Sequence, residues 1–507
     1  MVVDELKYKI LQQFGFPPTQ EQANALDVFA RFLTDRNPQV VMILRGSAGT
    51  GKTSLSGVIV RTLQSIRQKV MLLAPTGRAA KVFSLNSGTP AYTIHRRIYR
   101  EKSFSGVDGQ FNLNDNLFTD TLFMVDEASM VANMGLGGMN FGSGCLLDDL
   151  VHFVYQGRND RLMLIGDKAQ LPPVGEEESP ALNAAMLQGY GLTVYECDLN
   201  EVLRQSEQSG ILYNATMIRQ MITHDDITQL PKIRFTGFSD IKPMPGAELI
   251  EALADSYHHV GLDDTIVVTR SNKRANIFNQ GIRNMVLDRE EELSQGDILM
   301  IVKNNYYWME EERKKLSEER RVKSEEFNCL ANHKVQSSNL KAQSNDIPAF
   351  LANGDRAKVL KVRRRIDLYG FRFATLLLQF PDYGNYELEA TVLLDTLTSE
   401  APALTHEQQE QLFHQIEEDY QDVPLKADRM KAIRQDQFYN ALQVKFAYAV
   451  TCHKAQGGQW AHVYVDQGYM TDDMLTPDYI HWLYTAFTRA TEMLYLVNWP
   501  ETQIETS

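Results

Sequence analysis

The sequence has few cysteines and no long apolar segment. Its four cysteines are widely scattered among 507 residues, at Cys145, Cys197, Cys329 and Cys452. No pair has the spacing of a metal site or of a disulfide framework. The longest apolar runs span about five or six residues, far short of the roughly 20 that a membrane helix needs. The first residues are acidic in part and lack the apolar core of a secretory signal. These absences predict a protein of the reducing cytoplasm with no membrane association.

The chain also lacks an excess of positive charge. It has 51 Lys and Arg residues against 65 Asp and Glu residues, which gives a formal net charge of −14. Such a balance argues against a protein that coats nucleic acid over its whole surface, although it allows a local basic groove. Any contact with nucleic acid must therefore be argued from particular residues. The length exceeds that of one hydrophobic core, so we expect about two to four domains.

The sequence does contain a phosphate-binding pattern. Five apolar residues at 40–44 predict a buried strand. The residues that follow, 46–53, match Gly-x-x-x-x-Gly-Lys-Thr. Glycines in this loop allow backbone conformations that are closed to residues with a Cβ atom. The loop N–H groups can then point inward and surround anionic oxygens. This pattern after a strand predicts a site for a nucleoside triphosphate.

The residues of the loop have distinct expected roles. Lys52 reaches the β- and γ-phosphates, and Thr53 offers its hydroxyl to Mg²⁺. The helix that begins near Lys52 adds the positive end of its dipole. The expected nucleotide-binding residues of this loop are Gly46, Ala48, Gly49, Thr50, Gly51, Lys52, Thr53 and Ser54. We expect ATP and Mg²⁺ as the cofactors.

Gln22 lies upstream of the loop, in a segment with helical spacing, and two interpretations of it are open. In the first, Thr19 is the N-cap of a helix and Gln22, three residues later, completes a capping box. In the second, the Gln22 amide reads the adenine edge, because one amide offers both a donor and an acceptor.

Two later apolar stretches also end in polar side chains, as strands do at the edge where α/β proteins bind ligands. Asp126 and Glu127 follow the apolar residues 122–125. Because neighbours on a strand point in different directions, Asp126 can hold Mg²⁺ through water while Glu127 polarises the attacking water. Gln170 follows another short strand and could sense the γ-phosphate. The repeated strand–helix pattern predicts a doubly wound α/β sheet.

The remaining segments indicate further domains. Turn signals between aromatic-bearing arms predict a β-hairpin at 99–118. Mixed charges at 309–326 predict a solvated helix. Strand-like runs joined by polar turns predict a small β-barrel, with a helical excursion that begins at the capping box of Thr405. A second helix is expected from after Pro424 to about 442, followed by a strand at 446–450.

These expectations divide the chain into domains. The first lobe is expected at 1–198, with the hairpin inserted in it. The second lobe is expected in two parts, at 199–295 and 443–507. The barrel and its helical excursion are expected between these parts, at 296–442.

Eight stretches, taken in order, resemble the motifs of the superfamily 1 DNA helicases, in the 5′-to-3′ branch that contains RecD and Dda. They are Gly46–Thr53, Ala74–Ala80, Thr93–His95, Asp126–Met130, Gly166–Pro173, Leu203–Gln205, Thr451–Gly457 and Tyr484–Arg489. The resemblance spans nearly the whole chain. It implies two RecA-like lobes with ATP between them, and an SH3-like barrel as an accessory domain. It also implies that the hairpin at 99–118 separates the two DNA strands.

The resemblance assigns roles by position. It implies that Lys52, Glu127, Gln170, Arg204 and Arg489 are the catalytic residues. Arg204 and Arg489 resemble two arginines that the second lobe supplies to the γ-phosphate, where charge develops during phosphoryl transfer. Gly457 joins the nucleotide-binding residues. The implied DNA contacts are Pro75, Thr76, His95, Thr451 and His453, with Phe104 or Phe111 as the strand-separating wedge.

The function implied by the resemblance is that of a monomeric, ATP-dependent DNA helicase. It would translocate on single-stranded DNA from 5′ to 3′ and unwind duplex junctions, with replication or repair proteins as partners. One alternative is an RNA-directed helicase, because contacts to the backbone alone do not exclude the 2′-hydroxyl. Another is an ATP-gated subunit of a larger DNA-repair complex, like RecD. The sequence shows no cluster of nuclease carboxylates, so we expect no strand cleavage.

Overall fold

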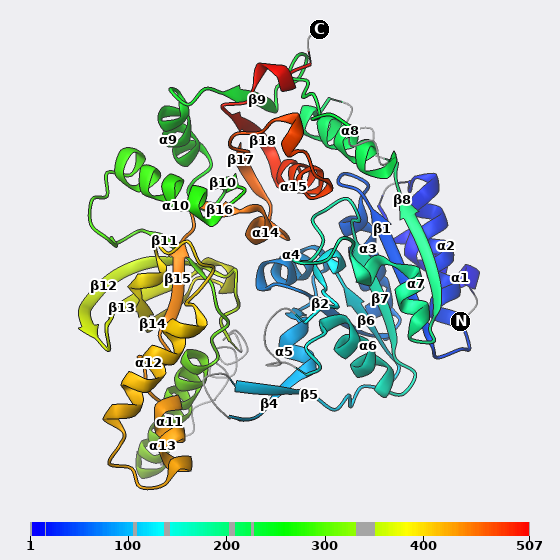
Figure 1. The fold of residues 1–507 in the computed structure, drawn as a ribbon. Coiled ribbons are helices and arrows are strands. Elements are labelled where there is room, and N and C mark those ends of the chain that lie inside the picture. Colours follow the sequence, from blue (N-terminus) through cyan, green and yellow to red (C-terminus); the bar gives the residue numbers. More distant parts are fainter. Residues whose placement is uncertain are drawn as a thin grey trace. The chain divides into compact units, whose positions relative to one another are not determined.

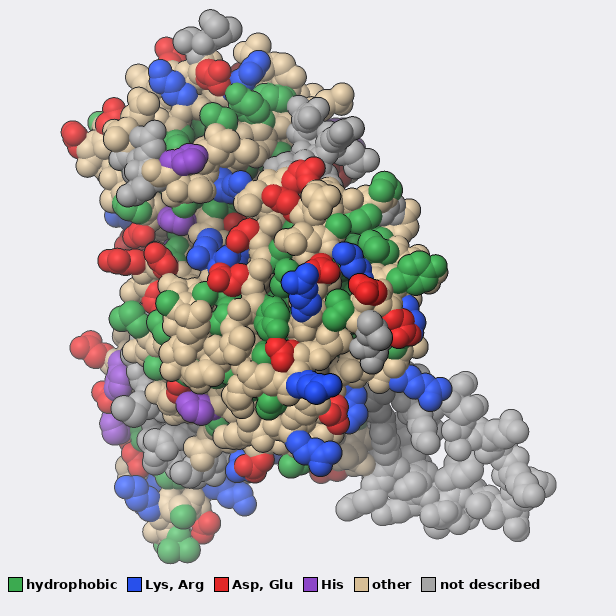
Figure 2. All heavy atoms as spheres, turned by 90° about the vertical axis from the view of Figure 1, so that its right-hand side faces the viewer, with side chains coloured by type: hydrophobic (Ala, Val, Ile, Leu, Met, Phe, Trp, Pro, Cys, Tyr) green, Lys and Arg blue, Asp and Glu red, His purple; other side chains and the backbone are tan. Residues whose placement is uncertain are grey.

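The computed structural model describes residues 3–15, 17–104, 109–135, 142–201, 208–224, 228–330 and 350–505 (Figure 1). The chain divides into two compact units, one of residues 1–271 with 450–507, and one of residues 272–449. Within the described ranges, no helix is both long enough and apolar enough to cross a membrane. Lys and Arg side chains are interspersed with Asp and Glu side chains over the face in Figure 2. This face is therefore not uniformly basic.

The first sheet has six strands. Their order is β3 (Ala91–Thr93), β2 (Lys69–Ala74), β6 (Thr121–Val125), β7 (Arg161–Gly166), β1 (Val40–Gly46) and β8 (Thr193–Leu199). Every neighbouring pair is parallel. The carboxyl ends of the strands therefore share one edge, which brings the phosphate loop and the segments after β2, β6 and β7 together.

Helices cover both faces of this sheet. Val40, Met42 and Leu44 of β1 pack into one core with helices α1 (Val3–Gln12), α2 (Gln20–Thr34), α3 (Lys52–Ser65) and α4 (Gly77–Ser87). Val41 and Ile43 pack into the other core, with α5 (Ile94–Ile98), α6 (Leu146–Gln156) and α7 (Ala184–Gly189). Because both faces are buried, the strands are continuous apolar runs rather than alternating patterns. The predicted doubly wound sheet is confirmed.

The predicted hairpin is present as β4 (Tyr99–Phe104) and β5 (Gly109–Leu113), which pair antiparallel. A buried carboxylate holds its base, because the Tyr99 hydroxyl donates to Asp149 Oδ2 at 2.7 Å. The backbone N–H of Ser143 donates to the same carboxylate at 3.0 Å. Gly142 packs so closely that a Cβ atom there would lie 2.8 Å from Tyr99 Cε1. The side chains of the two wedge candidates, Phe104 and Phe111, lie outside the described residues.

The second lobe is built on a five-stranded sheet, as expected. The strand order is β16 (Ala449–Thr451), β10 (Thr265–Thr269), β17 (Trp460–Asp466), β18 (Ala490–Val497) and β9 (Ile241–Met244). Its helices are α8 (Gly210–His224), α9 (Leu249–His259), α14 (Cys452–Ala455) and α15 (Pro477–Phe487). The pairs β10–β17, β17–β18 and β18–β9 are parallel. The two lobes lie in one compact unit, so contacts between them belong to one body.

The second unit contains a closed five-stranded barrel, which confirms that expectation. Its strands are β11 (Ile298–Ile301), β12 (Arg356–Leu368), β13 (Phe371–Phe380), β14 (Tyr386–Leu393) and β15 (Leu442–Phe446). Its helices are α10 (Asn272–Gly281), α11 (Tyr307–Leu330), α12 (His406–Asp419) and α13 (Lys426–Arg434), and one turn of π-helix runs over Ile282–Val286. Helix α12 begins at Thr405 with the predicted capping box.

Two boundaries differ from expectation. The helix after Pro424 ends at Arg434 rather than near 442, because Asp436 Oδ1 accepts the N–H groups of Phe438 and Tyr439 and forms a turn. The strand expected at 446–450 is instead split between two sheets, β15 and β16. The amide of Asn279 causes this break, because it binds the carbonyls of Phe446 and Ala449 and the N–H of Ala449.

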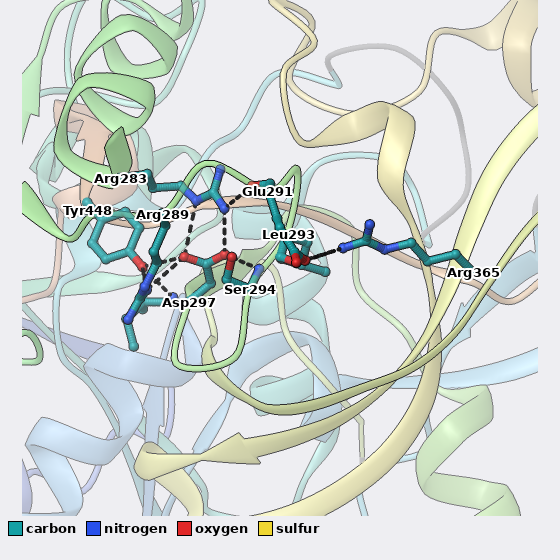
Figure 3. A network of polar contacts seen from close by, with 9 residues as sticks. Arg283, Arg289, Glu291, Leu293, Ser294, Asp297, Arg365 and Tyr448 are labelled. Carbon is teal, nitrogen blue, oxygen red and sulfur yellow. Dashed lines mark hydrogen bonds and ion pairs between the residues drawn. The ribbon is translucent and has the colours of Figure 1, made fainter. Parts of the chain in front are cut away.

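A buried carboxylate fixes the start of the barrel (Figure 3). Asp297 is fully buried, and it pairs with Arg283 at 3.1 Å and with Arg289 at 2.8 Å. The hydroxyl of Tyr448 donates to Asp297 Oδ1 at 2.8 Å, and burial raises the pKa of Tyr448. Two guanidiniums and a hydroxyl thus satisfy a charge that would be very costly alone. This network joins the π-helix, β11 and the segment after β15.

Candidate nucleotide site

The phosphate loop has the backbone conformation that its glycines predict. Gly49 and Gly51 have φ angles of +77° and +82°, in the left-handed region that favours glycine. A Cβ atom on Gly46 would lie 2.8 Å from Thr50 Oγ1 and 2.9 Å from Lys52 Cγ. The loop therefore forms a tight concave turn that only glycine fits at its first position. Its shape suits the oxygens of a phosphate chain.

Lys52 lies along the loop at the start of α3. Its Nζ donates to the carbonyls of Gly46 at 2.6 Å and Ser47 at 2.9 Å. Thr53 and Ser54 are exposed in the first turn of α3. Cationic nitrogen, hydroxyls and the positive end of a helix thus converge on one point. This donor set fits a nucleoside triphosphate.

Asp126 and Glu127 follow β6 at the same edge of the sheet. Burial and the neighbouring charge of Glu127 raise the pKa of Asp126 to about 7. Two adjacent, half-buried carboxylates repel each other, and a divalent cation with oxygen ligands relieves this repulsion. Glu127 has a φ angle of +52°, which is uncommon outside glycine and is typical of functional sites. The pair fits Mg²⁺.

The Gln170 amide bridges the two lobes. In the orientation that satisfies both neighbours, its nitrogen donates to Glu127 Oε2 at 3.2 Å, and its oxygen accepts from Arg489 Nη2 at 3.2 Å. Arg489 comes from the second lobe, and it is 3% exposed. It also donates to the carbonyls of Thr485 and Gly458. The structure thus brings together Glu127, Gln170 and Arg489 from three distant parts of the chain.

Two residues of the second lobe contact the loop and were missed by the sequence analysis. The hydroxyl of Tyr484 accepts the N–H of Ala48 at 3.0 Å and donates to Asp167 Oδ2 at 2.7 Å. Arg219, on α8, donates to the hydroxyl of Ser47. Tyr484 opens a stretch that resembles a helicase motif, which was the available signal for it. Arg219 lies in no such stretch, so nothing in the sequence marked it.

The contacts of Gln22 agree with the capping interpretation. Its side chain accepts the N–H of Thr19 at 3.1 Å and completes the capping box of α2. Its Nε2 also donates to the carbonyl of Thr50, inside the phosphate loop, at 3.0 Å. Gln22 is 2% exposed, so it braces the loop from behind. Contact with an adenine edge stays a prediction.

Two other residues were predicted to act at the nucleotide site, Gly457 and Arg204, and only Gly457 is among the described residues. Gly457 has a φ angle of +75°, and a Cβ atom there would lie 3.1 Å from Ala79 Cβ and 3.4 Å from Thr76 Oγ1. It therefore lies where the second lobe meets the start of α4. Arg204 lies outside the described residues, and its role stays a prediction.

The predicted DNA contacts gather at the loops after β2, β3 and β16. Thr76 is the N-cap of α4, next to Pro75, and the hydroxyl of Thr76 accepts the N–H of Ala79 at 3.2 Å. His95 is half-buried in α5, and burial lowers its pKa to about 4, so its ring is neutral near pH 7. Thr451 is the N-cap of α14, and His453 is exposed in the first turn of that helix.

Comparison with known proteins agrees with this geometry. A family model described as "AAA domain" matches residues 18–230, and one described as "UvrD-like helicase C-terminal domain" matches residues 446–497. The chain is 26% identical to the ATP-dependent RecD2 DNA helicase of Deinococcus radiodurans, over 57% of this chain and 36% of that protein. It is 24% identical to the ATP-dependent DNA helicase dda of Enterobacteria phage T4, over 56% of this chain and 60% of that protein. The chain is thus similar to ATP-dependent DNA helicases of the RecD2 and Dda kind.

The chain spans less than two thirds of the length of either relative. A crystal structure of the Pif1 helicase from Bacteroides, in complex with ADP-AlF3 and single-stranded DNA, aligns with 97% of this chain and 95% of that one, at 14% identity and a TM-score of 0.45. The residues matched by the AAA model include the phosphate loop at 46–53.

Proposed function

We propose that this chain is an ATP-driven motor that moves along single-stranded DNA from 5′ to 3′ and unwinds duplex DNA. The observation that carries the proposal is the Gln170 amide between Glu127 and Arg489. It links a carboxylate of the first lobe to a cation of the second at the edge that holds the phosphate loop. Phosphate chemistry at this point would therefore depend on how the lobes are placed.

The proposed chemistry uses residues of both lobes. Glu127 holds and orients the attacking water and takes its proton, and Gln170 positions Glu127. Arg489, together with Arg204, stabilises the charge that spreads over the γ-phosphate oxygens. Thr53 and Asp126 would hold Mg²⁺, which supplies further positive charge to the phosphates. Loss of the γ-phosphate removes the anion that draws the arginines in, and the lobes can then separate.

The DNA path follows from the same placement. Pro75, Thr76, His95, Thr451 and His453 come from both lobes, so their separation changes when the lobes close. Alternating grip by the two sets would convert this motion into steps along the backbone. The hairpin of β4 and β5 would part the strands ahead of the motor. We also propose that the chain works as a monomer in a reducing cytoplasm, where Cys145, Cys197 and Cys452 would stay the free thiols that they are in the structure.

Unwinding of tailed duplexes tests this proposal. The purified chain with ATP and Mg²⁺ is expected to unwind a 5′-tailed duplex and not a 3′-tailed one, and its ATP hydrolysis is expected to rise strongly with single-stranded DNA. Lys52→Ala should abolish both activities, because it removes the cation at the β- and γ-phosphates. Unwinding by the Lys52→Ala protein would contradict the proposal.

Two matched measurements address the alternatives. Equal stimulation by RNA and DNA of one sequence would favour an RNA-directed helicase. A monomer by size exclusion that hydrolyses ATP but unwinds neither duplex would favour a subunit of a larger DNA-repair complex. DNA-specific stimulation and unwinding by the monomer alone would exclude both.

A further inference from the structure

A second-lobe arginine outside the helicase motifs contacts the phosphate loop. Arg219 lies on α8, and its Nη1 donates to the hydroxyl of Ser47. Ser47 directly follows Gly46 in the loop and is 6% exposed. The eight stretches that resemble helicase motifs do not include Arg219. Its contact with the loop therefore needs an explanation of its own.

Helix α8 is fixed to the second lobe, so Arg219 moves with that lobe. The Asn214 side chain donates to the carbonyls of Gly210 and Arg234, at 2.7 and 2.9 Å, and accepts the N–H of Arg234 at 2.9 Å. Asp240 accepts the N–H of Gly210 at the start of the helix, at 2.7 Å. The helix also packs against α15. The position of the Arg219 guanidinium therefore follows the position of the second lobe.

Arg219 and Lys52 both bind the residue that follows the first glycine of the loop. Lys52, which reaches the β- and γ-phosphates in loops of this kind, donates to the Ser47 carbonyl at 2.9 Å. Arg219 binds the side chain of that same residue. Both cations therefore contact Ser47 at the start of the loop. The next residue, Ala48, is held by Tyr484 of the second lobe.

Arg219 has no charge partner among the residues that the structure describes. In the parts of the chain that the structure describes, no carboxylate forms an ion pair with Arg219, and its buried Nε has no hydrogen-bond partner. The hydroxyl of Ser47 is a neutral acceptor. A guanidinium with spare donors beside a phosphate loop is matched to an anion, because it can bind phosphate oxygens through more than one N–H group.

We propose that Arg219 is a third arginine, besides Arg204 and Arg489, with which the second lobe recognises the terminal phosphate of the bound nucleotide. This rests on the proposed function. Ser47 holds the guanidinium at the edge of the loop. The contact with phosphate then forms with a triphosphate and not with a diphosphate, so Arg219 sets the preference for ATP over ADP and stabilises charge during hydrolysis.

Nucleotide affinities of Arg219 variants test the proposal. The probes are fluorescent ADP and a fluorescent, non-hydrolysable ATP analogue, each with Mg²⁺ and without DNA. Arg219→Gln is expected to weaken binding of the ATP analogue about tenfold and to leave ADP binding within about twofold, because only the triphosphate loses a charged contact. Arg219→Lys keeps the positive charge and should recover part of the ATP preference. The rate of DNA-stimulated ATP hydrolysis by Arg219→Gln should fall at saturating ATP.

Two further variants separate this role from a structural one. Ser47→Ala removes the hydroxyl that holds Arg219 at the edge of the loop, so it should lower the preference for the ATP analogue in the same direction as Arg219→Gln but by less. Arg234→Gln, in the same lobe, removes an exposed arginine that lies over Tyr213 and Phe238 and should change neither affinity.

An unchanged ratio in Arg219→Gln would overturn the proposal, as would an equal change of ratio in Arg234→Gln. Neither outcome depends on DNA, so they are distinct from failure of the helicase function. A melting temperature close to that of the unmodified protein shows that Arg219→Gln is folded.

Discussion

At the scale of single residues, the phosphate loop depends on the absence of one atom. A Cβ atom at Gly46 would lie 2.8 Å from Thr50 Oγ1, 2.9 Å from Lys52 Cγ and 3.0 Å from Leu199 Cβ. These neighbours belong to the loop itself and to the adjacent strand, so none can move without changing the cradle. The glycine at the first position of the loop is therefore required because a side chain would not fit there.

Gly46→Ala is expected to weaken nucleotide binding more than tenfold, because the added methyl group displaces Lys52 and Thr50. Isothermal titration with the ATP analogue measures the affinity. Gly189→Ala is the matched control, since a Cβ atom at Gly189 would meet nothing within 4 Å. Equal affinities for the two variants would show that the loop tolerates a side chain.

A second residue makes stability depend on pH. Asp355 is 1% exposed, and burial raises its pKa to about 7 although Tyr383 and the N–H of Ala352 donate to it. Its pKa in the folded state is thus above its unfolded value of about 3.9. The folded state holds the proton more tightly, so the free energy of unfolding should fall as the pH rises from about 4 to about 7.

Asp355→Asn removes this titration and keeps an acceptor for Tyr383. It is expected to stabilise the barrel by roughly 1–4 kcal/mol at pH 8, because one pKa unit corresponds to about 1.4 kcal/mol, and by much less at pH 5. Thermal melts at both pH values measure the difference. Asp367→Asn, at an exposed position of β12, should show no such difference. An Asp355→Asn change in stability that is the same at pH 8 as at pH 5 would refute the account.

At the scale of elements, the base of the hairpin is the part that couples to the helices beneath it. Tyr99 begins β4, and its hydroxyl is bound to Asp149 of α6. Removing this hydroxyl leaves a buried carboxylate with one donor fewer, at a cost of about 1–3 kcal/mol. The hairpin would then be oriented less firmly, while the phosphate loop is not touched.

Tyr99→Phe is therefore expected to slow unwinding of a tailed duplex several-fold and to leave DNA-stimulated ATP hydrolysis within about twofold. Stopped-flow unwinding and a coupled ATPase assay on the same protein measure the two rates. Tyr190→Phe is the control, because the Tyr190 hydroxyl makes only a 3.4 Å contact with Asn133. Parallel losses of both activities in Tyr99→Phe would argue for general destabilisation instead.

Elements with a local cause were predictable from sequence, and those with a distant cause were not. The phosphate loop and the capping boxes at Thr19 and Thr405 follow from neighbouring residues, and the structure contains them. The break after β15 was missed because it is made by Asn279, about 170 residues earlier in the chain. The helix after Pro424 was predicted to be too long, because the turn at Asp436 stops the helix from continuing.

The candidate site shows the same limit. The residues after β6 and β7 were expected at one edge because parallel strands bring their carboxyl ends together. The contacts of Arg219 and Tyr484 with the loop depend on how the two lobes pack, and no local pattern encodes that packing. A basic or aromatic residue in an ordinary helix carries no mark of the partner that it will reach.

At the scale of the whole molecule, the account is a nucleotide site completed by two lobes. The first lobe supplies the loop, Glu127 and Gln170, and the second supplies Arg489. The net charge of −14 means that affinity for DNA must come from local contacts rather than from a general field. Hydrolysis should therefore respond to DNA through the relative placement of the lobes.

The most direct test is the rate of ATP hydrolysis by Arg489→Gln, measured with and without single-stranded DNA at saturating ATP. The account predicts a fall of about a hundredfold or more in the DNA-stimulated rate, with ADP affinity within a few-fold of that of the unmodified protein. A DNA-stimulated rate that survives the loss of this guanidinium in a folded protein would contradict it.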